Sequence, residues 1–383
     1  MKPLESKLPT VGTTIFTVMS QLAEQHRAVN LSQGFPDFSP PAGLLERLEV
    51  CLRGRYHQYA PMPGSVALRT AIAAKLAALY GVSVDPAAAI TVTSGATEAI
   101  FCAIQAVVRR GDEVVVFDPC YDSYEPSITL AGGRTIHVPL ERPGFRMDWE
   151  RFEAALSART RLVIVNSPHN PSGALLTAAD YARFAALLRS YDCYFLSDEV
   201  YEHVVFDGAR HATVLASLEL AERSFAVFSF GKTYHATGWK LGYCIAPPAL
   251  SAELRRVHQY VTFASTSPLQ QAIAEYLTEH PEHHENLPAF YQERRDYFAA
   301  LLGSTKFKPQ RAAGTYFQLA DYGEISSLRD VDFARWLTIE HGVAVIPISV
   351  FYEQPPADLK LVRFCFAKEN ATLDAAAERL ARL

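Results

Sequence analysis

The sequence predicts an α/β fold with a large domain around a mostly parallel, doubly wound sheet and a smaller α+β domain. Short apolar runs alternate with helical patterns from Leu44 to about Val257, which is typical of a parallel sheet covered by helices on both faces. After Pro268 the pattern changes to long helices followed by short strands. A chain of 383 residues is also longer than one compact core usually supports.

The change of pattern defines the expected domains. An N-terminal arm, residues 1–43, is expected to contribute to the small domain. The large domain is expected at residues 44–268 and the small C-terminal domain at residues 269–383. Short strands of the small domain are predicted at residues 314–319 and 361–366, where apolar residues cluster.

Helices are predicted where alanine and helical apolar spacing coincide, at residues 67–80 and 97–109, and two long helices are predicted within residues 269–302. Short apolar runs predict the strands of the large sheet. These runs are residues 89–93, 113–117, 135–138, 162–166, 194–197, 225–229 and 242–246.

The composition is that of an ordinary globular protein, with 49% hydrophobic and 20% charged residues. A net charge of −5 without a basic run argues against a nucleic-acid partner. The first ten residues lack the apolar segment of a signal peptide, and no apolar run reaches membrane-spanning length. We therefore expect a cytoplasmic protein without a membrane partner.

The six cysteines are widely spaced and form no CxxC or Cys/His motif. Because most lie in apolar stretches, we expect reduced core residues and neither disulfides nor a metal site. They are Cys51, Cys102, Cys120, Cys193, Cys244 and Cys365.

Polar residues follow several of the predicted strands. Open α/β sheets bind ligands at the carboxyl ends of their strands, so these segments are where chemistry is expected. The segments are residues 94–97, 118–121, 166–171, 198–201 and 229–232.

Lys232 is the most informative residue, because it follows the apolar run 225–228 at the end of a predicted strand. Desolvation and a second cation at Lys240 favour loss of its proton, and a neutral amine forms a Schiff base with an aldehyde. We therefore predict that Lys232 binds pyridoxal 5′-phosphate (PLP) as a cofactor. The alternative, a surface lysine in a glycine loop without a chemical role, is disfavoured. A Walker phosphate loop is excluded, because Ala226 stands where that motif requires glycine.

A PLP site needs a carboxylate that keeps the pyridine nitrogen protonated. Asp198 is the candidate, with Glu199 as the rival carboxylate and a capping role as the structural alternative. Tyr201 and Asn170 can donate hydrogen bonds to the ring oxygen, although each also suits a purely structural position. Tyr121 can cover the face of the ring.

The cofactor phosphate needs backbone amides at a helix N-terminus together with hydroxyls and cations. Gly95, Ala96 and Thr97 open a predicted helix directly after a strand, which suits anion binding. Ser229 and Lys240 would add a hydroxyl and a positive charge.

Arg363 lies within the strongly apolar run 361–366. An unpaired charge in such a strand is costly, so an anionic partner is expected. Because arginine binds carboxylates with two parallel hydrogen bonds, the partner can be the carboxylate of an amino-acid substrate. A structural salt bridge is the alternative.

Seven ordered motifs span nearly the whole chain: residues 30–38 (NLSQGFPDF), 58–61 (QYAP), 94–97 (SGAT), 170–173 (NPSG), 197–202 (SDEVYE), 229–240 (SFGKTYHATGWK) and 363–366 (RFCF). In these motifs the chain resembles the class I aminotransferases of PLP fold type I. It most closely resembles the kynurenine/methionine aminotransferase group, which includes bacterial methionine aminotransferases. The resemblance implies the fold type I architecture, PLP as cofactor and an obligate homodimer with active sites at the interface.

The resemblance also implies a role for each catalytic residue. Lys232 would bind the cofactor covalently and later move the proton. Asp198 would pair with the pyridine nitrogen, Asn170 and Tyr201 with the ring oxygen, and Tyr121 would stack on the ring.

The ligand-binding residues follow from the same resemblance. The phosphate would be held by Gly95, Ala96, Ser229 and Lys240, with Tyr59 reaching it from the other subunit. The substrate carboxylate would be held by Gly34, Asn170 and Arg363.

Three positions of the side-chain pocket depart from the kynurenine-transaminating relatives. Ala96 stands where some of them carry tyrosine, Ala264 where they carry histidine, and Phe16 replaces a tryptophan. These departures argue against kynurenine as the main substrate. An apolar, polarizable pocket for a thioether or a ring would come from Phe16, Tyr59, Phe263 and Tyr316.

The predicted function is a ping-pong aminotransferase that converts an L-amino acid and a 2-oxo acid. Methionine is the expected donor, with aromatic amino acids, glutamine or histidine as alternatives. A PLP-dependent cysteine-S-conjugate β-lyase uses the same cofactor chemistry and stays open as the alternative. A PLP-sensing regulator without turnover is disfavoured, because such regulators carry a DNA-binding head for which this chain has no room.

Overall fold

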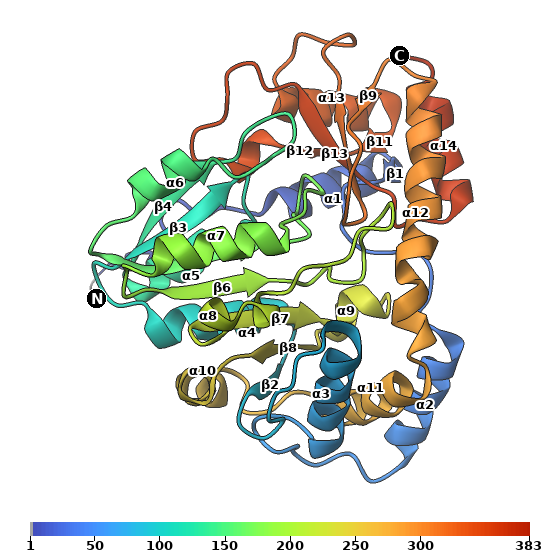
Figure 1. Cartoon of the computed structure of the whole chain (residues 1–383). Coiled ribbons are helices and arrows are strands. Elements are labelled where there is room, and N and C mark those ends of the chain that lie inside the picture. The colour runs from blue at the N-terminus through green and yellow to red at the C-terminus, as the bar shows by residue number, and fades with distance from the viewer. Residues whose placement is uncertain (1–2) are drawn as a thin grey trace.

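The computed structural model describes residues 3–383, and a seven-stranded sheet lies at its centre (Figure 1). The strand order is β2-β8-β7-β6-β5-β3-β4. Strands β3 to β7 pair in parallel, whereas β8 runs antiparallel to both of its neighbours. This confirms the predicted α/β class with a mostly parallel sheet. The strands are β2 (Ile90–Thr93), β3 (Glu113–Asp118), β4 (Arg134–Pro139), β5 (Thr160–Asn166), β6 (Tyr194–Asp198), β7 (Ser224–Ser229) and β8 (Gly242–Ile245).

Both faces of this sheet are buried, because successive side chains of a strand point to opposite faces. In β3, Val114 and Val116 pack on one side, while Val115 and Phe117 pack on the other. The first side is covered by α4 (Ala96–Val107), α5 (Tyr124–Ala131) and α10 (Pro248–Val261). The second is covered by α3 (Val66–Tyr80), α6 (Trp149–Ala155), α7 (Ala178–Leu188) and α8 (Leu218–Ala221).

Local signals set the ends of these helices. Helix α3 begins where the Ser65 side chain accepts a hydrogen bond from the Leu68 amide, and it ends at Gly81, whose φ is +65°. Helix α7 begins with a capping box between Thr177 and Asp180. Shorter helical turns are α9 (Phe230–Thr233), η1 (Val214–Ala216), η2 (Thr237–Trp239) and η3 (Ser349–Phe351).

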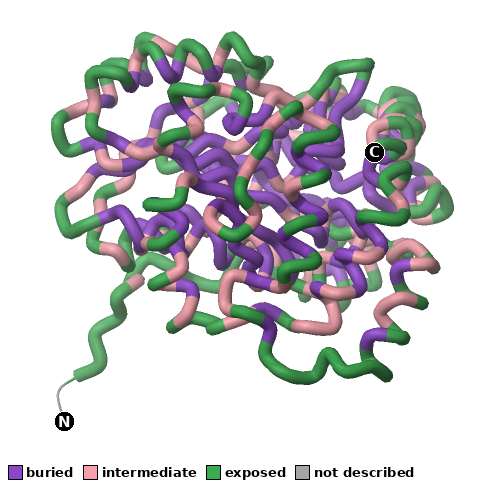
Figure 2. Tube along the Cα trace, turned by 60° about the horizontal axis from the view of Figure 1, so that its bottom comes forward, coloured by how far each residue is buried: buried purple, intermediate pink, exposed green. Residues whose placement is uncertain are grey.

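A second, antiparallel sheet lies in the C-terminal part of the chain, with the order β12-β13-β10-β9. The N-terminal segment lies against this part, because β1 (Val29–Asn30) pairs in parallel with β11 (Val343–Ala344). Figure 2 shows the exposed start of the described chain projecting away from the body. The other elements are α1 (Ile15–Gln25), β9 (Lys308–Pro309), β10 (Phe317–Asp321), α13 (Asp330–His341), β12 (Ile346–Pro347), β13 (Leu361–Cys365) and α14 (Asn370–Leu380).

Two long helices, α11 (Ser267–Glu279) and α12 (Glu282–Gly303), follow the large sheet, and α2 (Ala42–Arg53) packs against α11. The proposed domain boundary after residue 268 falls inside the first turn of α11. The division into residues 1–43, 44–268 and 269–383 stays a prediction.

One predicted strand of the C-terminal part is misplaced. The expected strand at residues 314–319 begins only at Phe317. Thr315 has a φ of +62°, and a side chain at Gly314 would collide with Pro168 at 2.7 Å, so this segment bends against a loop. The sequence shows no change of pattern at this bend, so the apolar run predicts a strand that begins three residues too early.

The cysteines are buried and unpaired, as the sequence indicated. None of the helices within residues 3–383 combines the length and the apolar character that crossing a bilayer requires.

Candidate active site

A cavity of about 240 Å³ lies at the carboxyl ends of β5, β6 and β7, beside the start of α4. This is the place where doubly wound sheets bind their ligands. The fold brings most of the predicted site residues to its wall. These are Phe16, Gly34, Gly95, Ala96, Thr97, Tyr121, Asn170, Asp198, Tyr201, Ser229, Lys232, Lys240 and Arg363.

Lys232 lies on α9, the single helical turn that follows β7. Its Nζ donates hydrogen bonds to the Tyr316 hydroxyl at 3.0 Å and to the Gly34 carbonyl at 3.2 Å. Desolvation lowers the pKa of the amine to about 8, and the positive charges of Arg363 and Lys240 act in the same direction. About a tenth of this lysine is therefore a neutral nucleophile at pH 7, far more than for an ordinary lysine.

Asp198 ends strand β6 and is 4% exposed. Burial raises the pKa of its carboxyl to about 6, although a hydrogen bond from the Tyr124 hydroxyl at 2.7 Å opposes the shift. The neighbouring Glu199, the rival carboxylate, does not line the cavity, because it contacts the His211 ring and accepts a hydrogen bond from the Val214 amide. Asp198 is thus the carboxylate that faces the cavity.

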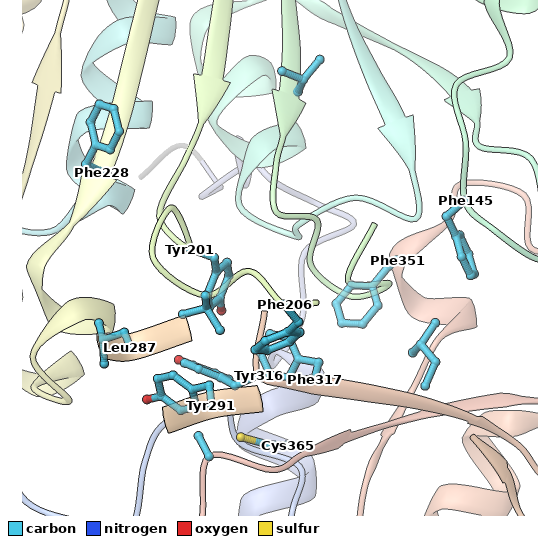
Figure 3. Packing of buried hydrophobic residues seen from close by; sticks show 14 of the residues in the cluster. Phe145, Tyr201, Phe206, Phe228, Leu287, Tyr291, Tyr316, Phe317, Phe351 and Cys365 are labelled. Carbon is cyan, nitrogen blue, oxygen red and sulfur yellow. The ribbon is translucent and has the colours of Figure 1, made fainter. Parts of the chain in front are cut away.

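Three aromatic residues lie together beside Lys232, and Figure 3 shows Tyr201, Tyr316 and Phe317 as one group. The rings of Tyr201 and Tyr316 meet edge to face with 5.2 Å between their centroids. Burial raises the pKa of the Tyr201 hydroxyl, so this group stays protonated and can donate a hydrogen bond.

The start of α4 forms an anion-binding corner. Gly95 caps the helix with a φ of +81°, and no side-chain hydrogen bond from the described residues caps this end, so the first amides of the helix can bind an anion beside the cavity. A side chain at Gly95 would meet the Lys240 Nζ at 3.3 Å, and one at Gly242 would meet the Ala96 amide nitrogen at 2.8 Å. Both glycines therefore allow Lys240 and strand β8 to approach the helix N-terminus closely.

Arg363 lies in β13 and is only 1% exposed. Its guanidinium donates to the Asn170 side-chain oxygen at 2.8 Å and to the Ser32 carbonyl at 3.0 Å, and it lies 3.9 Å from the Phe317 ring centroid. Its Nε has no hydrogen-bond partner, and no carboxylate within residues 3–383 lies within ion-pair distance. The structural salt bridge considered for this arginine is therefore not made by the described part of the chain.

Tyr59 and Phe263 lie outside the cavity of this chain. They are 85% and 45% exposed, and their rings meet edge to face at 5.3 Å. The expected place of Phe263 in the substrate pocket is therefore not seen in the cavity of this chain, and the role of Tyr59, expected from the other subunit, stays a prediction.

Two residues at the site were assigned no role from the sequence. Tyr124 holds the carboxylate of Asp198, and Asn166 donates from its Nδ2 to the Asp198 carbonyl at 2.8 Å. The Oδ1 of Asn166 also accepts a hydrogen bond from the Asn170 amide at 2.7 Å. Asn166 ends a predicted strand, and this position indicates a site residue. Tyr124 lies in a helix, where the sequence does not distinguish a site residue from a packing residue.

The fold also brings together three possible metal ligands that lie apart in the sequence. Asp118, Cys120 and His137 offer ligand atoms within 4.8 Å of one another. The sequence does not show this cluster, because His137 on β4 comes close to Asp118 only through the pairing of β4 with β3. Asp118 is already engaged, since its two oxygens lie 2.8 Å from the His137 Nδ1 and 3.0 Å from the Glu353 amide.

The residues of the cavity fit PLP. The partly neutral Lys232 suits the aldehyde, and the buried carboxylate of Asp198 suits the pyridinium. The helix N-terminus beside Lys240 suits the phosphate. The buried Arg363, which has no anionic partner within residues 3–383, suits the substrate carboxylate.

Comparison with known proteins agrees with this fit. Residues 26–380 match the family described as aminotransferase class I and II. The chain is 54% identical to methionine aminotransferase of Escherichia coli over 379 residues, which cover 99% of this chain and 98% of that protein. It is 33% identical to mouse kynurenine–oxoglutarate transaminase 1, with coverage of 94% and 93%. A solved Escherichia coli structure with a methionine aminotransferase function superposes with a TM-score of 0.97, 54% identity and full coverage of both chains.

The fold and the site together define a PLP-dependent enzyme of fold type I. Within that class, the chain belongs to the class I and II aminotransferase family. The protein is therefore an aminotransferase, whose substrates are amino acids and 2-oxo acids, and the predicted resemblance is confirmed.

The pKa of Lys232 predicts how the protein takes up its cofactor. Only the neutral amine attacks the aldehyde, so the rate of covalent attachment to PLP-free protein should rise about tenfold between pH 6 and pH 7 and level off above pH 8. Stopped-flow absorbance measures this rate, with Lys232→Ala as the control that should show no attachment. A rate that keeps rising to about pH 10 would mean that Lys232 has the pKa of an ordinary lysine.

Proposed function

We propose that the protein transfers the amino group of L-methionine to a 2-oxo acid by a ping-pong mechanism. The observation that carries this proposal is the convergence of Lys232, Asp198 and the unpaired Arg363 on one cavity. The choice of methionine is supported by the 54% identity to methionine aminotransferase of Escherichia coli.

Arg363 orients the substrate in this proposal. Its two terminal nitrogens present a planar fork that suits a carboxylate, and Asn170 holds one of them at 2.8 Å. The buried guanidinium also gains an anion that the described part of the chain does not supply. Gly34 lies beside the same site, and its lack of a side chain lets the Phe317 ring pack closely, because a Cβ there would meet that ring at 2.8 Å.

Lys232 moves the proton of the substrate α-carbon. The Tyr316 hydroxyl and the Gly34 carbonyl hold its Nζ toward the cavity. An amine with a pKa of about 8 can both accept and return a proton near neutral pH.

PLP, when bound, supplies an electrophilic aldehyde and a ring that withdraws electrons from the α-carbon. Asp198 would pair with the ring nitrogen, and hydrogen bonds from Tyr124 and Asn166 fix the position of this aspartate. Asn170 and Tyr201 would donate to the ring oxygen, and Tyr121 would cover the ring. Gly95, Ala96, Thr97, Ser229 and Lys240 would bind the phosphate.

The walls of the cavity support a large apolar side chain as substrate. Phe16, Ile100, Leu241 and Phe317 line it, and aromatic rings make favourable contacts with a thioether sulfur. Ala96 adds only a methyl group to this wall and so leaves room for the substrate side chain. A cysteine-S-conjugate β-lyase is the second candidate and is not favoured, because the similar proteins are named as aminotransferases.

We also propose a homodimer whose sites lie near the subunit interface. Its support is the exposed apolar group formed by Tyr59, Tyr260, Val261 and Phe263, since exposed groups of this kind commonly mark interfaces. A cytoplasmic location stays a proposal and is supported by six buried, unpaired cysteines.

The donor assignment predicts a spectral change. L-Methionine added to the PLP-loaded protein without an oxo acid should remove the visible absorbance and produce the near-ultraviolet band of pyridoxamine phosphate. Lys232→Ala is the control and should not complete this conversion. An unchanged spectrum with methionine but a change with another amino acid would reject methionine, whereas ammonia release would indicate β-elimination.

Arg363→Lys should weaken substrate binding but not cofactor binding. Loss of the two-pronged contact removes about 1.5–3 kcal/mol, so the KM for amino and oxo acids should rise about tenfold to a hundredfold. The Kd for PLP should stay within about twofold. Arg53→Lys, which changes an exposed arginine paired with Glu49, should alter neither quantity. An unchanged KM in Arg363→Lys would show that another group binds the carboxylate.

The homodimer predicts a sedimentation mass of twice the chain mass of 42.4 kDa for the PLP-loaded protein. Analytical ultracentrifugation over a range of protein concentrations measures it. A fully active monomer would contradict the proposed role of Tyr59.

A further inference from the structure

A second cavity, of about 510 Å³, lies next to the active site and is larger than the cavity at Lys232. It opens at the carboxyl ends of β3 and β5, between Phe117, Asn166 and α6. Its far wall is the segment 310–313 that joins β9 to β10. Cavities of about 300–1,000 Å³ are typical of sites for small molecules.

The lining of this cavity is mostly apolar. The side chains of Leu140, Phe145, Met147, Trp149, Leu175 and Leu176 line it. Phe145 is 4% exposed although its φ is +51°, a conformation that costs free energy for a residue with a side chain. Figure 3 shows Phe145 well apart from the group of Tyr201, Tyr316 and Phe317, so this residue lies away from Lys232 and its aromatic neighbours.

One positive and one negative side chain lie together at the hairpin that borders the cavity. Glu141 and Arg146 are partners across an antiparallel bridge, with backbone hydrogen bonds of 2.8 and 3.1 Å. Side chains at such opposed positions point to the same face. Both are exposed, and neither forms an ion pair within residues 3–383.

The other charged residues of the lining are already engaged. Asp180 accepts hydrogen bonds from the Thr177 amide and hydroxyl, and Arg311 pairs with Asp207. An occupant would therefore meet one guanidinium and one carboxylate at the hairpin and a mostly apolar lining beyond them. A zwitterion with an apolar side chain complements this arrangement.

The cavity shares a wall with the active site. Tyr121 and Asn166 line both cavities. Tyr124 lines the second cavity, and its hydroxyl donates to the Asp198 Oδ2 at 2.7 Å. Asn166 donates to the Asp198 carbonyl. A molecule in the second cavity would thus touch the side chains that hold Asp198.

We propose that this cavity binds a second α-amino acid with an aromatic or large apolar side chain and that its occupancy alters turnover. The carboxylate lies on Arg146, the ammonium on Glu141, and the side chain packs against Trp149 and Leu175. The effect reaches the active site through Tyr121, Tyr124 and Asn166. This inference goes beyond the proposed function and does not depend on methionine as the donor.

The stoichiometry of binding tests the proposal. L-Phenylalanine is the probe, and equilibrium dialysis uses the PLP-loaded Lys232→Ala variant, which does not consume it. Adding Arg146→Glu should lower the number of phenylalanine molecules bound per chain by one. Adding Arg142→Glu, a reversal of the same charge on the same hairpin but outside the lining, should leave the number unchanged. The same number in both double variants overturns the proposal.

Kinetics of proteins with Lys232 intact provide the second test. Phenylalanine that competes at Lys232 raises the KM for the donor in every variant. Binding in the second cavity instead changes kcat, by about fivefold or more, in the wild type and in Arg142→Glu but not in Arg146→Glu. An identical kcat response in all three proteins overturns the coupling to the active site. Loss of methionine turnover in every protein would reject the proposed donor and leave the dialysis result unaffected.

Discussion

The active site depends on holding three ionisable groups out of water around one cavity. Lys232, Asp198 and Arg363 come from the region after β7, the end of β6 and the middle of β13. Desolvation lowers the pKa of the lysine and raises that of the aspartate. The arginine is buried as well and has no anionic partner in the described part of the chain. The costs at Asp198 and Arg363 would be offset by the pyridinium of the cofactor and the carboxylate of the substrate, and Lys232 would react with the cofactor aldehyde.

The sheet supplies the rigidity that this arrangement needs. Parallel strands with both faces covered place the ends of β5, β6 and β7 next to one another, and the hydrogen bonds of Tyr124 and Asn166 fix Asp198 between them. The same edge continues to β3 and β4, where the second cavity lies. One row of strand ends therefore carries both the chemistry and the proposed regulatory site.

Much of the fold was predictable because buried parallel strands are short apolar runs, and each strand of the large sheet lies within two residues of its predicted bounds. The strands of two residues, such as β1 and β11, were missed because they are too short to show a period. Among the site residues, Lys232 and Arg363 were predictable because a charge beside or within an apolar strand is unusual. Tyr124 was missed because a tyrosine in a helix is ordinarily a packing residue.

The sequence by itself determined the order of the elements, the chemical types of the site residues and, through its motifs, the family to which the chain belongs. Only the tertiary structure decided which of the adjacent carboxylates, Asp198 or Glu199, faces the cavity, because that choice depends on strand pairing and on the contacts of Glu199 with His211. The structure also separated Tyr59 and Phe263 from the cavity of their own chain. Burial and proximity arise from contacts between distant segments, so local patterns do not encode them.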